Sequence, residues 1–360
     1  MLPFLKMVND DVAKKPFVSV IIPTWRDQKI LSECLGGLAK QDYPRNRYEI
    51  ILVSADKLEV TELGVKIVYV PQNTNPAGAR NIGVAAARGE ILAFVDDDCI
   101  IPPDWISKAV CCLQEKNAAL VGGPAVPPDN RPFSYRLAGY LLGAPFVTGS
   151  INGRYRAAKK TGEADDYNLI LANNFVRKDA FLAISGFDVD QLPCEDYGLY
   201  SRLKKAGYKL IYAPEIAVRH HVKPLFFPFI NKIFYFANGR SLLMLRHPET
   251  ARLLYLIPSI FTLALAVVIP LGFFSIKFLY LLAGILSIYA VWILICAFYI
   301  FLKFEKNPLV FLYSPPAIFL AHLSYGLGFL HGIYKYLIGD YKGGIKSGGK
   351  YRQDSEIHRD

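Results

Sequence analysis

The chain has 360 residues, of which 52% are hydrophobic, and a formal net charge of +10. The hydrophobic share exceeds that of an average soluble domain, so a purely soluble protein is not expected. The charge does not indicate a nucleic-acid partner, because much of it gathers beside apolar runs: residues 219–252 hold six Lys or Arg against one Glu.

Two local signals place the N-terminal part of the chain in the cytoplasm. The opening "MLPFLKMV" is too short for a signal peptide. The six cysteines show neither CxxC nor metal-finger spacing, as expected of reduced thiols. We therefore expect residues 1–222 to stay on the cytoplasmic side.

Strand and helix patterns alternate over the first hundred residues. Apolar runs at 17–23, 48–54, 65–70 and 90–96 predict the buried strands of a parallel sheet. Ile30, Leu31, Cys34, Leu35 and Leu38 share one helical face after the first strand. This order predicts an α/β fold.

A second helix has clear end signals. Asn75 suits the N-cap, Pro76 the first turn, and Gly89 the position just past the end. The fourth strand follows directly.

The pattern changes after residue 127. Residues 127–168 are rich in Pro, Gly, Tyr and Arg with weak periodicity, which predicts a long, partly mobile loop. Residues 168–181 predict a strand that runs into a helix, and a later helix ends at Gly207 before a strand at 208–214. Aromatic residues mixed with isolated cations over 225–249 predict a pair of interfacial helices.

Three apolar runs follow, at 253–276, 278–302 and 309–334. Each exceeds the roughly 18 residues that a membrane-spanning helix requires. Three crossings would place the tail outside the cell, and this is the arrangement we expect. The basic tail favours the cytoplasmic side instead. A re-entrant hairpin, marked by Pro258 and Pro270 or by Pro315 and Pro316, would give an even number of crossings.

Polar clusters follow two of the predicted strands. These are "PTWRD" at 23–27 and "DDDC" at 96–99. Ligands of open α/β sheets bind beyond the carboxyl ends of the strands, so we expect the site here. Three adjacent carboxylates repel one another and favour a bound cation, and oxygen ligands suit Mg²⁺ or Mn²⁺. A solvated acidic turn is the alternative.

Three stretches together resemble the family 2 glycosyltransferases with the GT-A fold. They are "VSVIIPTWRD" (18–27), "NPAGARNIGVAAARGEILAFVDDD" (75–98) and "GFDVDQLPCEDYGLYSRLKKAGYKLIYAPEIAVRHH" (186–221). The resemblance covers about residues 17–245. It implies a Rossmann-like domain that uses a nucleotide-diphosphate sugar, with a UDP-sugar favoured, and a divalent metal, Mn²⁺ or Mg²⁺. It also implies transfer with inversion.

The resemblance also implies residue roles. The nucleotide-sugar would be bound by Pro23, Thr24, Arg26, Asp56, Arg80, Asp96 and Asp97. Asp98 would bind the metal together with His220 or His221, and the choice between the two histidines stays open, as does a role without any ligand.

Asp196, with Glu195 beside it, resembles the catalytic base, which takes a proton from the acceptor hydroxyl. An acidic residue here would also suit the N-cap of the following helix, and the two roles are compatible.

Two departures from the family pattern limit the prediction. "VSADKLE" (53–59) replaces a "VDDGSTD"-like stretch, which leaves the nucleotide open, with Asp56 as a substitute for base recognition. "NGRSLLML" (238–245) stands where processive members carry QxxRW, so we expect transfer of one sugar per encounter.

Four parts are expected in this multi-pass cell-membrane protein: a catalytic domain (1–222), an interfacial segment (223–252), a transmembrane region (253–338) and a polar tail (339–360). A polyprenyl-linked saccharide is the expected acceptor, because a sugar hydroxyl needs a base whereas a polyprenyl phosphate is already an anion. One alternative is a membrane scaffold that binds a nucleotide sugar without turnover. A nucleotidyltransferase is disfavoured because "PTWRD" contains no glycine.

Overall fold

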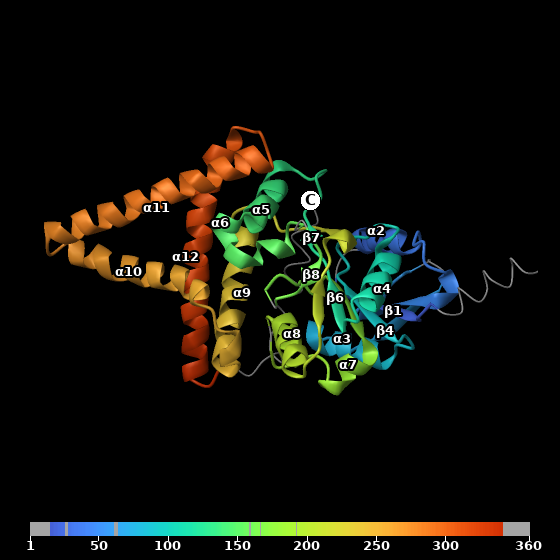
Figure 1. The fold of residues 1–360 in the computed structure, drawn as a ribbon. Helices are drawn as coiled ribbons and strands as arrows, with labels where there is room; N and C mark the ends of the chain where they lie inside the picture. Colours follow the sequence, from blue (N-terminus) through green and yellow to red (C-terminus); the bar gives the residue numbers. More distant parts are fainter. Residues whose placement is uncertain are drawn as a thin grey trace, which may run out of the picture.

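The computed structural model describes residues 15–25, 28–60, 64–157, 160–165, 167–191 and 193–340. These residues form an α/β domain and a helical part that projects from one end of it (Figure 1).

A mixed sheet forms the centre of the α/β domain. Its order is β3-β2-β1-β4-β9-β6-β10-β8. The strands are β1 (Val18–Thr24), β2 (Tyr48–Ser54), β3 (Val65–Tyr69), β4 (Ile91–Val95), β6 (Leu120–Gly122), β8 (Gly162–Glu163), β9 (Asn173–Arg177) and β10 (Leu210–Tyr212). The four strands predicted over the first hundred residues are thus present as β1 to β4.

The parallel pairing predicted for the first four strands is confirmed, because β1 pairs in parallel with β2 and β4, and β2 with β3, but later strands make the sheet mixed. Strand β9 runs antiparallel to both β4 and β6, and β8 runs antiparallel to β10. A parallel neighbour would require a crossover connection before β9. The chain instead reaches β9 from the long segment after β7 and runs back along the sheet, so β9 is antiparallel to its neighbours.

A small second sheet lies beside the main one. It has the order β5-β11-β7, with β5 (Cys99–Ile100), β7 (Ala125–Val126) and β11 (Val218–His220). Strand β11 pairs with β5 in antiparallel register, with His220 opposite Cys99. This pairing brings the "DDDC" turn next to the two histidines, which are more than a hundred positions away in the sequence.

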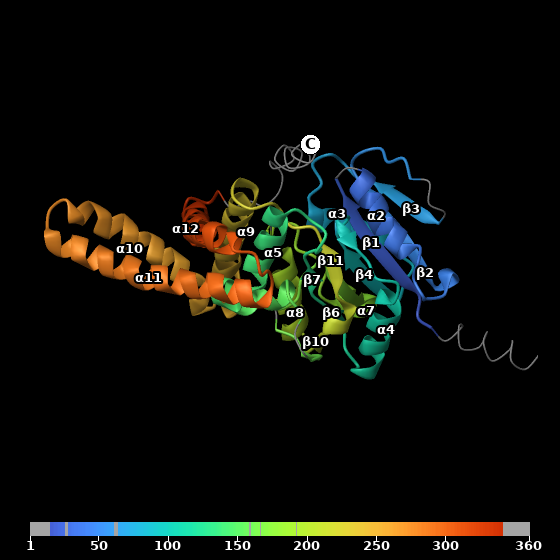
Figure 2. The ribbon, with the colours of Figure 1, turned by 90° about the horizontal axis from the view of Figure 1, so that it is seen from above.

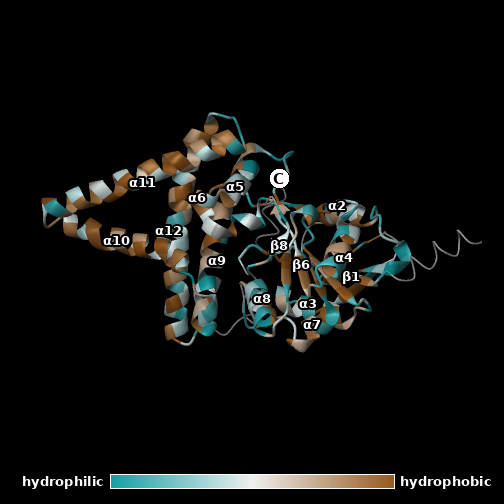
Figure 3. Ribbon diagram, viewed as in Figure 1, coloured by the Kyte–Doolittle hydropathy of each residue, from teal (hydrophilic) through white to brown (hydrophobic). Residues whose placement is uncertain are grey.

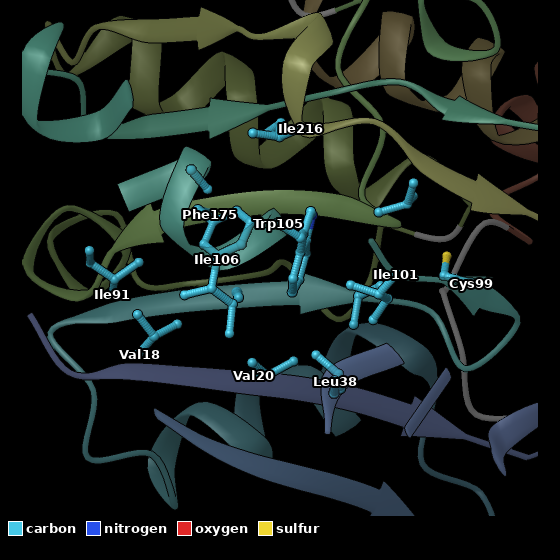
Figure 4. Packing of buried hydrophobic residues seen from close by; sticks show 14 of the residues in the cluster. Val18, Val20, Leu38, Ile91, Cys99, Ile101, Trp105, Ile106, Phe175 and Ile216 are labelled. Carbon is cyan, nitrogen blue, oxygen red and sulfur yellow. The ribbon is translucent and has the colours of Figure 1, made fainter. Parts of the chain in front are cut away.

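Helices cover both faces of the main sheet. Helices α2 (Gln28–Leu38) and α4 (Trp105–Glu115) pack on one face, where Trp105 and Phe175 lie with ring centroids 4.4 Å apart (Figure 4). Helices α3 (Pro76–Ala85), α7 (Lys178–Ala183) and α8 (Glu195–Lys205) pack on the other. The start of α3 is confirmed, because Asn75 Oδ1 accepts a hydrogen bond of 2.8 Å from the Gly78 N–H.

The prediction of a loop over 127–168 is wrong. This segment contains α5 (Phe133–Gly143), α6 (Pro145–Thr148) and the 3-10 helix η2 (Gly149–Arg154). Leu137 and Leu141 of α5 are buried in a cluster with Phe229, Cys296 and Val310 of the helical part. Their partners come from outside the α/β domain, which is why the local pattern did not reveal the helix.

The helical part contains α9 (Phe227–Arg246), the 3-10 helices η4 (Pro248–Thr250) and η5 (Leu253–Leu256), and then α10 (Ile257–Gly272), α11 (Ile276–Lys303) and α12 (Leu309–Leu337). One continuous helix, α9, replaces the predicted pair over 225–249. Three stretches are long and apolar enough to cross a membrane: Leu253–Gly272, Ile276–Lys303 and Leu309–Leu337.

These helices are arranged in layers. Helix α9 lies against the α/β domain, α12 lies on the outer side of α9, and α10 and α11 form a hairpin that projects from α12 away from the domain (Figures 1 and 2). The hairpin is hydrophobic over most of its surface, whereas α9 carries mixed polar and apolar residues (Figure 3). The hairpin joins the middle of α12, where a Cβ on Gly326 would lie 2.5 Å from the Pro258 carbonyl.

Helices α9 and α12 run parallel and approach each other closely. Ser324 Oγ donates to the Ile230 carbonyl at 2.9 Å. One and two turns further on, a Cβ at Gly328 would lie 2.4 Å from the Phe234 carbonyl oxygen, and one at Gly332 would lie 2.5 Å from that of Asn238. Small residues at every fourth position of α12 thus allow backbone contact.

Candidate active site

The carboxyl ends of β1, β2 and β4 meet at one edge of the sheet, because these strands are parallel neighbours. Pro23 and Thr24 end β1 opposite Val53 and Ser54 of β2, and the Thr24 side chain is fully buried. Asp56 follows β2 and is exposed, and its Oδ1 accepts a hydrogen bond of 3.0 Å from Gln72. The predicted nucleotide-binding residue Arg26 lies outside the described residues.

A buried arginine joins the end of β4 to the start of α8. Arg80 of α3 is 5% exposed; its Nη2 lies 2.6 Å from Asp96 Oδ1, and its Nη1 lies 3.4 Å from Glu195 Oε1. The structure therefore brings together three predicted site residues that are far apart in the sequence. Burial raises the pKa of Glu195, Arg80 opposes that rise, and the adjacent Asp196 carboxylate adds to it.

The second and third aspartates of the turn are buried, and the last one faces a histidine. Asp98 Oδ1 lies 3.0 Å from His220 Nε2, and Asp97 is buried beside it. His221 points the other way, since its Nε2 lies 3.1 Å from Glu33 Oε2 on α2. Adjacent residues at the end of a strand face opposite sides, so only His220 shares a site with Asp98.

These residues offer a ligand set for a divalent cation. Possible ligand atoms of Asp98, Cys99 and His220 lie within 4.8 Å of one another. Burial raises the pKa of the Cys99 thiol well above its usual range, and its Sγ points at the Ala172 carbonyl at 3.7 Å. Carboxylate oxygen and imidazole nitrogen suit Mn²⁺, so Asp98 and His220 fit such an ion better than the thiol does.

Asp196 pairs with a different arginine. Its Oδ2 lies 3.0 Å from Arg154 Nη1, and both side chains are buried. The Arg154 guanidinium also stacks on the Tyr197 ring, with 3.9 Å from Cζ to the ring centroid. Asp196 is not the N-cap of α8, because that position belongs to Cys194 in a left-handed conformation. Sequence reasoning missed Arg154, which lies in the segment that was predicted to be a loop.

The loop before α8 is held in place by α3. The Asn81 amide accepts from the Phe187 N–H at 3.0 Å and donates to its carbonyl at 2.9 Å, and Asn75 Nδ2 donates to the Val189 carbonyl at 2.8 Å. The loop turns at Gly186, whose φ is +68° and where a Cβ would meet the Phe181 ring at 2.9 Å. Helix α3 thus fixes both Arg80 and the approach to Glu195.

Comparison with known proteins identifies the class. Residues 19–181 match the family model for glycosyl transferase family 2. Glycosyltransferase AglE of Haloferax volcanii is 27% identical over 236 residues, which are 62% of this chain and 73% of that protein. A dolichyl N-acetyl-α-D-glucosaminyl phosphate 3-β-D-2,3-diacetamido-2,3-dideoxy-β-D-glucuronosyltransferase of Methanococcus voltae is 24% identical over 335 residues, 89% of this chain and 98% of that protein.

A solved structure agrees in fold. The mannosyltransferase PcManGT from Pyrobaculum calidifontis, in complex with GDP-Man and Mn²⁺, has a TM-score of 0.61 at 17% identity, covering 89% of this chain and 88% of its own.

The chain is therefore a glycosyltransferase with the GT-A fold. Residues 19–181 of its α/β domain match glycosyl transferase family 2, and the relatives support the use of a nucleotide sugar, as the resemblance in the sequence implied. The alternatives of a scaffold without turnover and of a nucleotidyltransferase lose their support.

The pKa of Glu195, raised by burial to about 7, predicts a dependence of stability on pH. A carboxyl group whose pKa is higher in the folded chain stabilises the fold at low pH, and that contribution is lost as pH rises through about 7. From pH 5 to 7.5 the free energy of unfolding of the wild type should fall relative to that of Glu195→Gln, by at most about 1.4 kcal/mol per pH unit.

Denaturant unfolding in mild detergent at several pH values measures this difference. The exposed Glu163→Gln is the matched control and should follow the wild type. Parallel profiles for the wild type and Glu195→Gln would show that Glu195 does not titrate in this way.

Proposed function

We propose that the protein transfers one sugar, with inversion and with the help of a divalent metal, from a nucleotide-diphosphate sugar to a lipid-linked saccharide at the membrane surface. The observation that carries the proposal is that the two adjacent carboxylates at the start of α8 have different arginine partners. Glu195 pairs with Arg80, which also pairs with Asp96, whereas Asp196 pairs with Arg154.

We call the part of the site around Arg80 and Glu195 the donor side and the part around Arg154 and Asp196 the acceptor side. Thr24, Asp56 and Asp96 lie where the strand ends gather, and the proposal places the nucleotide there. A cation held by Asp98 and His220 would neutralise the charge that develops on the departing diphosphate. Asp97 is buried in the same turn, whereas the Asp96 side chain is 29% exposed.

The proposed reaction is a single displacement. The acceptor hydroxyl oxygen forms a bond to the anomeric carbon while the bond from that carbon to the diphosphate oxygen breaks. Asp196 accepts the hydroxyl proton, so the nucleoside diphosphate leaves with the bonding electron pair. Because the oxygen attacks from the side opposite the leaving group, the anomeric configuration inverts.

Two observations support a lipid-linked acceptor. The Methanococcus voltae relative, which matches nearly the whole chain, is named as acting on a dolichyl-linked sugar phosphate. Apolar helices long enough to cross a membrane follow α9, after the catalytic domain. A UDP-sugar is the first donor to test, and GDP-sugars come next.

For the membrane arrangement, we propose that the α10–α11 hairpin crosses the bilayer and that α9 and α12 lie along its cytoplasmic surface. Helix α9 contacts the catalytic domain along its length, from Phe229 beside Val222 to Arg246, whose Nη1 donates to the Asp190 carbonyl at 3.0 Å. A spanning α12 would carry α9, and with it this polar domain, to the depth of the hydrocarbon, which is costly.

The hairpin itself suits lipid. Its tip exposes Phe273 and Phe274, which are 88% and 84% exposed, and Ile288 on α11 is 76% exposed. Two crossings place the basic tail on the cytoplasmic side, as its charge favours, and leave the catalytic domain cytoplasmic. This is the even-numbered alternative to the three crossings expected from hydropathy.

Replacing the proposed base tests the function. Asp196→Asn cannot accept the proton, so kcat should fall about 10²- to 10⁴-fold while donor affinity stays unchanged. The measurement is transfer of labelled sugar to a lipid-linked saccharide fraction, with nucleotide binding followed in parallel. Asp179→Asn removes an exposed carboxylate paired with Arg177 and should keep full activity. Transfer to polyprenyl phosphate that survives Asp196→Asn would contradict a sugar hydroxyl as the nucleophile.

The two histidines provide a matched test of the metal site. Purified protein should be stabilised against heat by one of UDP, GDP, ADP or CMP with Mn²⁺, and EDTA should abolish the effect. His220→Ala and Asp98→Asn should lose most of this stabilisation because they remove metal ligands. His221→Ala should retain it, since that ring faces Glu33. Loss in His221→Ala with retention in His220→Ala would refute the assignment.

The topology is tested by labelling cysteines from either side of the membrane. In a Cys111→Ser background, an impermeant maleimide should label Phe274→Cys only from outside and Ser347→Cys only from the cytoplasmic side. The parent, whose exposed Cys111 lies in the catalytic domain, serves as the cytoplasmic marker. Labelling of Ser347→Cys from outside would instead establish three crossings.

A further inference from the structure

Arg240 of α9 is a buried cation whose charge no described residue balances. It is 5% exposed, and no carboxylate of the described residues forms an ion pair with it. Its Nη1 is buried and makes no hydrogen bond to any of them. A buried charge is costly unless a counter-charge is present. A ligand that brings negative charge would remove this cost.

Two tyrosines hold the Arg240 guanidinium by its flat faces. Its Cζ lies 3.3 Å from the centroid of the Tyr197 ring and 4.6 Å from that of the Tyr255 ring. With the faces covered by rings, the donors of a guanidinium remain available only around its edge. In-plane N–H donors match the oxygens of a phosphate group, and a guanidinium fixed in advance loses little entropy on binding one.

Tyr197 also connects Arg240 to the proposed base. Arg154, the partner of Asp196, stacks on the same ring at 3.9 Å, and two guanidinium groups this close to one centroid must occupy opposite faces. The site on Arg240 is therefore near Asp196 but separated from it by a ring. A phosphate bound at Arg240 would therefore lie one aromatic ring and one arginine away from the Asp196 carboxylate.

Apolar residues precede Arg240 on one face of α9. Phe229, Ile233, Phe236 and Arg240 are spaced by four, three and four residues, so they share one helical face. A small cavity, with room for about one water molecule, lies beside Phe229, Ile233 and Phe236. Tyr255, the other ring on Arg240, belongs to η5, which leads directly into the membrane hairpin.

We propose that Arg240 binds the phosphate nearest the lipid-linked sugar of the acceptor, while the lipid follows the apolar face of α9 towards the bilayer. This inference rests on the proposed function and names the binding determinant of its acceptor. The donor diphosphate has separate determinants in Asp98, His220 and Arg80, on the other side of Glu195.

Direct binding of farnesyl diphosphate in mild detergent tests the proposal. EDTA is present throughout, so that a metal at Asp98 does not hold the diphosphate. The wild type should bind farnesyl diphosphate at least tenfold more tightly than farnesol or inorganic diphosphate. Arg240→Gln should weaken farnesyl diphosphate at least tenfold and leave farnesol unchanged, and Arg240→Lys should weaken it several-fold because it keeps the charge without the planar edge.

Two controls separate this effect from general damage. Arg246→Gln removes a positive charge from the end of the same helix and should bind like the wild type. Nucleoside diphosphate binding with Mn²⁺ should be unchanged in Arg240→Gln. Equal loss of both ligands would show that Arg240 serves the donor or the fold, and unchanged farnesyl diphosphate affinity would refute the site.

The outcomes also distinguish the inference from the function on which it rests. If Arg240→Gln does not fold, the wild type and Arg240→Lys still decide, because a wild type that prefers farnesol or binds the two equally refutes the site. Transfer to lipid-linked saccharides by a wild type that fails this binding test would overturn only the role of Arg240. Absence of both transfer and binding would overturn the lipid-linked acceptor itself.

Discussion

The structure depends on how two adjacent carboxylates are accommodated in a buried position at the start of α8. Glu195 and Asp196 repel each other, and each would be costly to bury without a cation. Two arginines from distant segments meet this requirement, Arg80 from α3 and Arg154 from η2. Because each arginine belongs to a different part of the domain, neutralising the pair also fixes where those parts meet. The boundary between the donor and acceptor sides of the proposed site therefore lies at the start of α8, where each carboxylate requires its own cation.

The proposed donor side could be predicted from the sequence because its signals are local. A buried strand followed by three aspartates, and a helix with Asn75 at its N-cap, were predicted and are found as β4 and α3. The choice between His220 and His221 could not be made in this way. Alternation along a strand places adjacent residues on opposite faces, but which face meets Asp98 is decided by the pairing of β11 with β5.

The proposed acceptor side could not be predicted from the sequence, because its residues are brought together by contacts with the helical part. Helix α5 was predicted as a loop, since Leu137 and Leu141 pack against residues from α9, α11 and α12. The sequence does not distinguish Arg154 and Arg240 from the other basic residues, because only the folded chain shows that both stack on the Tyr197 ring. Hydropathy likewise measures the length of α12 but does not reveal that Ser324, Gly328 and Gly332 hold it against α9.

Close packing of α9 between α12 and the catalytic domain connects the apolar helices to the proposed site. A Cβ on Gly239 would lie 2.6 Å from the Pro193 carbonyl, so α9 meets the segment that enters α8 at backbone distance. Backbone contact on both sides of one helix leaves little freedom for it to shift, since packed interiors do not deform continuously. The proposed base is thus set at a fixed height above the hairpin, through Tyr197, Arg240 and Tyr255. An acceptor whose lipid is confined to the bilayer presents its sugar at a nearly constant height as well. A rigid connection between base and membrane therefore performs part of the positioning that a soluble enzyme must achieve with substrate contacts alone.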